Sequence, residues 1–326
     1  MTPIAVLVVL TAVAMLIGLF RNRLPWEVVR IGYVLGLCTP LLALAYASWQ
    51  LWHRWVGWPE LALLGGFYLC TGLGITVGYH RFLAHRSFET GPAVEAVLLV
   101  LGAMALPARP LDFAAYHLQH HAHSDRNGDP HSPRDGFLHA HIGWTFGRQR
   151  PDRERYCRHL RGDRVLAFVD RTSLQWFGIG LLLPALMDGW KGFLWGGLVR
   201  MAVQNHATFA VNSVGHAFGS RPFTTADHSR NNLLVALWSL GEGWHNNHHA
   251  FPSAASHGIG WRQPDISALL IRSLARLHLV WNVRQVPEAA RARRKRAAAS
   301  AGGSVGGSRG RPVTAAGERT DARRHP

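Results

Sequence analysis

The chain has 326 residues, of which 48% are apolar, and it carries a formal net charge of +16. Its three cysteines include no CxxC pair, so we expect neither a disulfide framework nor a thiolate metal site. Half of the positive excess lies between Arg284 and Pro326, where 11 Lys and Arg face 3 Asp and Glu. Because no nucleic-acid-binding module accompanies this charge, we expect no nucleic acid among the partners.

The apolar residues are gathered in blocks with charged residues between them, which indicates an integral membrane protein in contact with the lipid bilayer. Pro3–Phe20 is expected to be a retained first span, because it has no basic N-terminal region and no clear cleavage site. Ile31–Leu51 and Leu61–Tyr79 are each long enough for a hydrocarbon core of ~30 Å. Pro92–Leu106 is shorter and is predicted to be re-entrant or interfacial.

A polar, arginine-rich segment follows, and then two more apolar blocks, Leu174–Met187 and Phe193–Val214, which predict a helical hairpin. The arginines between the first two blocks and those after the third place both stretches on the cytoplasmic side, which fits five spans. We therefore expect an extra N-terminal span and linker over residues 1–28, a catalytic domain over 29–285, and a basic disordered tail over 286–326.

Histidine is the unusual residue of this chain, with 20 copies. Nine of them and one asparagine form four groups: His80 and His85; His117, His120 and His121; Asn212 and His216; and His245, His248 and His249. Offsets of three and four residues place side chains on one face of a helix. The offset of five between His80 and His85 corresponds to roughly 140° on an ideal α-helix, so these two are predicted to converge only where the helix ends or bends.

Nine imidazoles are too many for one metal ion, so the spacing predicts two metals held where four chain segments meet. Neutral imidazole binds iron, zinc, copper and nickel. Structural zinc sites close at four ligands, and a site with this many histidines is better matched to iron that activates oxygen.

At these groups the sequence resembles the membrane fatty acid desaturases, and specifically their acyl-CoA Δ9 branch, over about residues 30–285. The matching segments are His80–Phe88, His117–Ser132, Gly143 with Trp144, Asn212–His216 and Gly241–Pro252. The resemblance implies an all-α integral membrane fold, a four- to five-span helical bundle whose cytoplasmic helical cap holds a di-metal site.

The resemblance also implies a reaction. Two Fe²⁺ ions and O2 would remove two hydrogens from a long-chain acyl substrate, expected to be acyl-CoA, and leave a cis double bond at Δ9. The nine histidines would bind the irons directly and Asn212 through a water, and Thr208 would lie where the acyl tunnel bends. Electrons would come from a separate protein of the cytochrome b5, ferredoxin or rubredoxin type with a NAD(P)H reductase.

Carboxylates usually orient metal-binding imidazoles, and the candidates near the histidine groups are Asp125, Asp129 and Glu242. The isolated histidines are expected at the surface or at interfaces; these are His53, His159, His257 and His278. The arginines between Arg148 and Arg164 could bind the phosphates of an acyl-CoA, although an ordinary cytoplasmic positive bias is the preferred interpretation.

Two alternatives to desaturation remain from the sequence. A related iron site could hydroxylate the acyl chain instead. A membrane metal transporter or sensor would need no reaction, but it would hold its coordinating residues near the bilayer midplane. Here the histidines gather at the ends of the predicted spans, which argues against a transporter.

Overall fold

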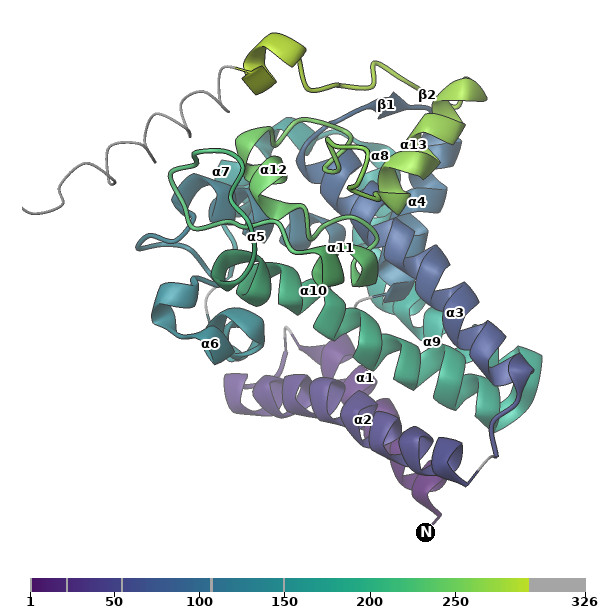
Figure 1. Ribbon diagram of the computed structural model, residues 1–326. Helices are drawn as coiled ribbons and strands as arrows, with labels where there is room; N and C mark the ends of the chain where they lie inside the picture. The colour runs from purple at the N-terminus through teal and green to yellow at the C-terminus, as the bar shows by residue number, and fades with distance from the viewer. Residues whose placement is uncertain (1, 22, 54, 106–107, 149, 293–326) are drawn as a thin grey trace, which may run out of the picture.

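The computed structural model describes all residues except 1, 22, 54, 106–107, 149 and 293–326 (Figure 1). The described residues form helices and one small sheet, in which β1 (Glu89–Thr90) pairs antiparallel with β2 (Val280–Trp281). The predicted fold class, a helical protein with membrane spans, is confirmed. Most of the predicted basic tail lies outside the described residues.

Within the described part of the chain, three helices are long and apolar enough to cross a membrane: α1 (Pro3–Phe20), α2 (Trp26–Trp52) and α3 (Trp58–Leu73) with its continuation. The continuation of α3 is a π-helical stretch, η1 (Gly74–Ala84), which follows without a break. A proline in the first turn begins both α1 and α3, since its missing N–H has no partner to lose there.

The next two helices, α4 (Pro92–Ala105) and α5 (Pro110–His123), meet at an angle of 84° and count as a fourth candidate span only if the bent pair is one unit. Such a bend is compatible with a broken span as well as with a re-entrant loop, so the re-entrant or interfacial segment stays a prediction. The predicted hairpin also forms, from α9 (Ser173–Gly192), the π-helical η5 (Phe193–Val199) and α10 (Arg200–Ala217). The helices of the hairpin are not among those long and apolar enough to cross a membrane, so membrane crossing by the hairpin stays a prediction.

Shorter elements gather at one end of the long helices, where α5 and α12 lie close together (Figure 1). They are η2 (Pro133–Asp135), α6 (Phe137–His141), η3 (Gly143–Phe146), α7 (Arg153–Tyr156), η4 (Arg158–Leu160), α8 (Arg164–Arg171), α11 (Leu233–Trp238), α12 (His245–Ala250) and α13 (Ile266–Arg276). Side chains of Asp163, Asn232 and Asp265 accept backbone N–H bonds at the starts of α8, α11 and α13.

Helix α4 packs closely against η1, the helix that carries His80. A Cβ atom on Gly74 would lie 2.2 Å from the backbone nitrogen of Gly102, and a Cβ on Gly102 would lie 2.5 Å from the Tyr79 ring. No side chain fits at either position, so the two glycines allow this contact and fix η1 against its neighbour.

Candidate metal centre

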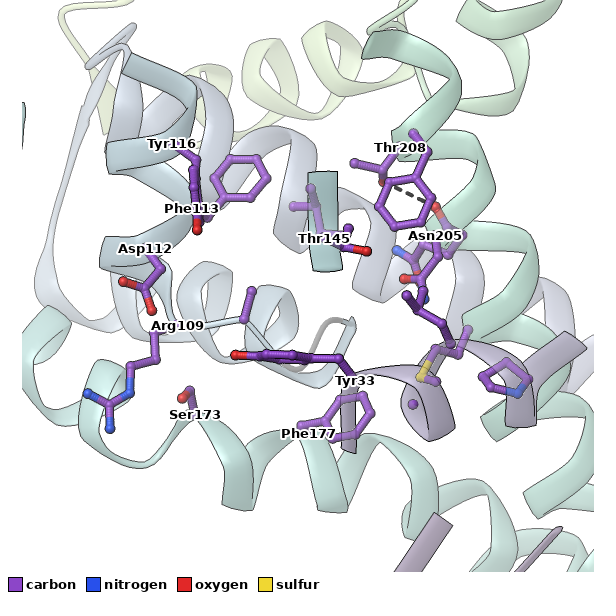
Figure 2. A pocket seen from close by; sticks show the side chains of 18 of the residues that line it. Tyr33, Arg109, Asp112, Phe113, Tyr116, Thr145, Ser173, Phe177, Asn205 and Thr208 are labelled. Atoms are coloured by element: carbon purple, nitrogen blue, oxygen red, sulfur yellow. Dashed lines mark hydrogen bonds between the residues drawn. The ribbon is translucent and has the colours of Figure 1, made fainter. Parts of the chain in front are cut away.

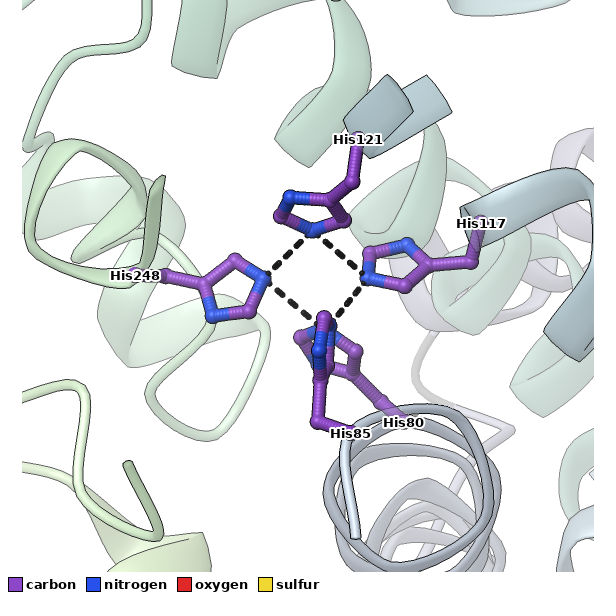
Figure 3. Close-up of side chains that lie close together, drawn as sticks. All are labelled: His80, His85, His117, His121 and His248. Atoms are coloured by element: carbon purple, nitrogen blue, oxygen red, sulfur yellow. Dashed lines mark hydrogen bonds between the residues drawn. The ribbon is translucent and has the colours of Figure 1, made fainter. Parts of the chain in front are cut away.

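Five histidines converge at the end of the helix bundle: His80, His85, His117, His121 and His248 (Figure 3). They come from η1 and the residue after it, from α5 and from α12, and one ring nitrogen of each lies within 4.8 Å of the others. In Figure 3 these nitrogens point toward a common centre. We call this set the five-histidine group.

The distances between these nitrogens are those expected around a metal ion. Nε2 of His121 lies 3.0 Å from Nε2 of His117 and 2.9 Å from Nε2 of His248, and the His80–His248 separation is 3.2 Å. Nitrogens bound at about 2.1 Å lie ~3.0 Å apart at right angles and ~3.4 Å apart at tetrahedral angles. Nε2 of His85 lies 2.6 Å from Nε2 of His117, so the five nitrogens are close enough for one ion to contact several of them at once.

A second set, the four-histidine group, consists of His120, His216, His245 and His249. Nε2 of His245 is 3.0 Å from Nε2 of His216 and 3.1 Å from Nε2 of His249. Nε2 of His120 is buried and has no hydrogen-bond partner among the described residues, as expected for a lone pair that faces a metal. The nine predicted histidines thus separate into two groups, each able to hold one ion.

His80 and His85 converge through the end of η1 and through its winding. The helix does end between them, as predicted, since η1 stops at Ala84 and His85 caps it, but the winding of η1 was not foreseen. The helix winds as a π-helix, in which hydrogen bonds connect residues five apart, and His85 N–H donates to His80 C=O at 3.1 Å. Because the wider turn brings residues five apart nearly into line, both rings face one centre.

Carboxylates hold the outward ring nitrogens of four histidines. The predicted candidates each do so: Asp125 lies 3.0 Å from His216 Nδ1, Asp129 lies 2.9 Å from His120 Nδ1, and Glu242 lies 2.5 Å from His80 Nδ1. A fourth, Asp227, lies 2.8 Å from His249 Nδ1 and was missed by the sequence analysis, since no spacing relates it to a histidine group. An Nδ1–H donated to a carboxylate leaves the Nε2 lone pair free to bind metal.

Arg81 balances the charge around Glu242. Its side chain is fully buried and lies 2.9 Å from Glu242 and 3.0 Å from Asp265. Burial alone would raise the pKa of Glu242, but the charges of His80, His257 and Arg81 outweigh it and hold that pKa well below its ordinary value. Glu242 is therefore ionised at neutral pH and able to accept the His80 proton.

The histidines of α12 are kept neutral. Burial, and then the neighbouring imidazoles, hold the pKa of His245 and His248 well below the ordinary value. Burial raises the pKa of Asp129 to about 6, although two backbone N–H groups bind its carboxylate. Neutral imidazole is the form that binds a divalent metal, so this donor set suits an ion such as iron, zinc, copper or nickel.

The prediction for His257 was wrong. Its ring is 1% exposed, packs 4.3 Å from the His248 ring and places Nδ1 3.2 Å from the Glu242 carboxylate. Two backbone N–H groups, of His257 and Gly258, donate to Asp265 and fold this loop over the site. The other three isolated histidines, His53, His159 and His278, are exposed as predicted.

A cavity of about 490 Å³ borders both histidine groups, with His80, His117, His120 and His245 in its wall. Asn212 and Thr208 also line it, one and two turns before His216 on α10. Figure 2 shows Arg109 and Asp112 at one side of the cavity and Asn205 and Thr208 at the other. The lining is mostly apolar, with charged side chains such as Arg109 and Asp112 among it, which suits an apolar ligand with a polar head.

Among the seven arginines between Arg148 and Arg164, only Arg150 lines this cavity. Arg153 instead binds Asp112 at 2.6 Å and Asp170 at 3.2 Å. The arrangement thus gives phosphate recognition by the whole arginine run little support.

Comparison with known proteins agrees with this site. The fatty acid desaturase family model matches residues 52–281. A hex-5-enoyl-(acyl-carrier protein) acetylenase of Moorena producens (strain JHB) is 36% identical over 266 residues, 75% of this chain and 83% of that protein. An sn-1 stearoyl-lipid 9-desaturase of Anabaena variabilis is 38% identical over 221 residues, 67% of this chain and 81% of that protein.

An icosanoyl-CoA 5-desaturase of Limnanthes douglasii is 36% identical over 249 residues, 75% of this chain and 68% of that protein. The residues matched by the family model include all nine histidines. The chain belongs to the fatty acid desaturase family.

Proposed function

We propose that this chain is an oxygen-dependent desaturase that introduces a cis double bond into a long-chain acyl group with two irons held by its histidines. The observation that carries the proposal is the position of the five-histidine and four-histidine groups beside one apolar cavity. Irons bound there would supply the oxidising power that breaks unactivated C–H bonds, which side chains alone cannot provide.

The protein's own residues would orient the imidazole rings, hold the acyl chain and exclude bulk water. Asp125, Asp129, Asp227 and Glu242 fix the imidazole rings through Nδ1. Asn212, one turn before His216 and on the cavity wall, is proposed to hold a water toward the four-histidine group. The apolar lining would exclude bulk water and hold the acyl chain against the histidines, with Thr208 among its contacts.

We further propose Δ9 as the position and a phosphate-bearing carrier for the acyl group. The stearoyl-lipid 9-desaturase among the relatives supports the position. Arg109, Arg150 and Arg171 line the cavity beside the acyl space and would bind phosphate. CoA and a phospholipid both offer that group; acyl-CoA is the carrier expected from the sequence. The cytoplasmic site and the separate electron donor also stay predictions.

Lipid analysis of cells that express the chain tests the proposal. We expect new monounsaturated chains, with the double bond located by mass spectrometry, and none from the His120→Ala variant. Purified protein supplied with O2, an electron-donor protein and its NAD(P)H reductase, and either stearoyl-CoA or stearoyl phosphatidylcholine distinguishes the carriers. Only hydroxylated chains would favour the hydroxylase alternative. Zinc alone, with no activity after iron loading, would favour a metal transporter or sensor.

A further inference from the structure

Helix α1 contributes one wall of the cavity. Residues lining the cavity include Thr11, Ala14, Met15, Ile17, Gly18 and Arg21. Thr11, Ala14, Met15 and Gly18 follow offsets of three and four residues, so they share one face of the helix. Side chains on other faces point outward: Val9, Val13 and Leu16 are 47%, 38% and 56% exposed. The helix therefore separates the cavity from the apolar outer surface.

Close contacts with two neighbouring helices hold α1 in this position. A Cβ on Gly32 of α2 would lie 2.5 Å from the Ile17 side chain, and a Cβ on Gly178 of α9 would lie 2.9 Å from Met15 Cε. Glycine at both positions makes room for an α1 side chain. Small residues on α2 and α9 thus allow α1 to pack as part of the cavity wall.

An ion pair connects the end of α1 to the helix that carries three of the histidines. Arg21, at the end of α1, lies 3.9 Å from Asp112 in the first turn of α5. Both side chains line the cavity and are partly exposed. A pair of this kind adds little stability, but it places a charged boundary beside the apolar part of the wall.

The cavity face of α1 is suited to an acyl chain. Ala14, Met15 and Gly18 offer no hydrogen-bonding side chain. The Thr11 hydroxyl donates to Leu7 C=O at 2.7 Å, so its proton needs no acceptor from a ligand. An apolar chain that packs here gains from leaving water and meets no unsatisfied polar side chain.

We propose that α1 is part of the substrate site, and that Ala14, Met15 and Gly18 contact the acyl chain and limit the space open to it. This inference rests on the proposed function, because it assigns part of the same cavity to the acyl substrate. It makes the N-terminal helix a determinant of substrate choice rather than a membrane anchor only.

Two matched variants test the wall. Ala14→Trp places a large ring on the cavity face, whereas Ala12→Trp places the same ring on an exposed position of the same helix that does not line the cavity. We expect Ala14→Trp to lower stearoyl desaturation by about tenfold or more relative to Ala12→Trp, because a site loses about that factor when it loses the space for one methylene. Equal iron per chain in the two variants shows that both are folded.

Met15→Ala widens the same wall and provides a second variant if Ala14→Trp fails to fold. It should raise the ratio of longer to shorter acyl products. Equal rates for the Trp pair, together with an unchanged product ratio for Met15→Ala, would overturn the inference.

Photolabelling gives a readout that does not require desaturation. Stearoyl phosphatidylcholine and stearoyl-CoA, each with a diazirine within the acyl chain, are bound to the full chain, and labelled residues are mapped by mass spectrometry. We expect labels on Ala14, Met15 or Gly18 that excess unlabelled stearoyl substrate removes. Labels confined to the outer face, at Val13 or Leu16, would contradict the inference. Competed labels on the cavity face without any desaturated product would support the inference while refuting the proposed reaction.

Discussion

Arg81→Met should destabilise the protein and empty its metal centre. The Arg81 guanidinium is fully buried, lies within 3.0 Å of both Glu242 and Asp265, and donates to Ala255 C=O at 2.8 Å. Removing it leaves two nearly buried carboxylates without their shared cation, and breaking a buried ion pair in this way costs about 3–5 kcal/mol. Because Glu242 also holds His80, the loss reaches the five-histidine group directly.

Tryptophan fluorescence during heating and iron content per chain measure the two effects. We expect the apparent Tm in detergent to fall on the order of 5–10 °C, with much of the iron lost. Arg81→Lys keeps the charge but loses the planar guanidinium that binds both carboxylates, so its Tm should lie between those of the unchanged protein and Arg81→Met. Arg158→Met, at an exposed position, is the matched control. An Arg81→Met protein with the Tm and iron content of Arg158→Met would refute the reasoning.

Three further outcomes follow from the geometry. Asp227→Asn should weaken iron binding about 10- to 100-fold, because His249 loses its carboxylate partner. Asp135→Asn, at an exposed position, should leave iron binding unchanged. Iron titration measures both affinities, and equal affinities would contradict the role of Asp227. Gly74→Ala should lower the apparent Tm, since its Cβ would lie 2.2 Å from a backbone atom, while Gly65→Ala, with nothing within 4 Å, should be neutral or stabilising. Burial alone would raise the pKa of Asp265, but the charge of Arg81 outweighs this effect and keeps that pKa below 3.8. The ionised Asp265 therefore stabilises the folded protein at neutral pH, and this stabilisation is lost as the pH falls from about 5 through the folded pKa. Asp265→Asn should therefore flatten the dependence of Tm on pH below 5, and an unchanged slope would exclude this carboxylate as its source.

The candidate site was predictable where helical spacing brought ligands together. Offsets of three and four predicted the α5 and α12 groups, and nine imidazoles predicted two metals. The same reasoning found Asp125, Asp129 and Glu242 because they lie near histidine groups in the sequence. The two groups themselves could not be separated, since each draws on α5 and α12, and only the packing of these helices decides which ring faces which centre.

Contacts between distant segments could not be predicted. Asp227 approaches His249 from a loop with no periodic pattern, and His257 is isolated in the sequence although its loop folds back onto Glu242. The extra N-terminal helix was predicted as a span, but nothing in its composition indicated that one face lines the cavity. The fold class followed from the apolar blocks.

The π-helix of η1 makes the number of residues between His80 and His85 a structural quantity. An α-helix brings residues four apart to one face, and a π-helix does this for residues five apart. A deletion within His80–His85 would leave a four-residue spacing that an ordinary α-helix could satisfy. An added residue would need a still wider turn or a break. The number of residues between the two histidines and the type of helix are therefore coupled. A chain that changes one must change the other to keep both imidazoles on the same ion.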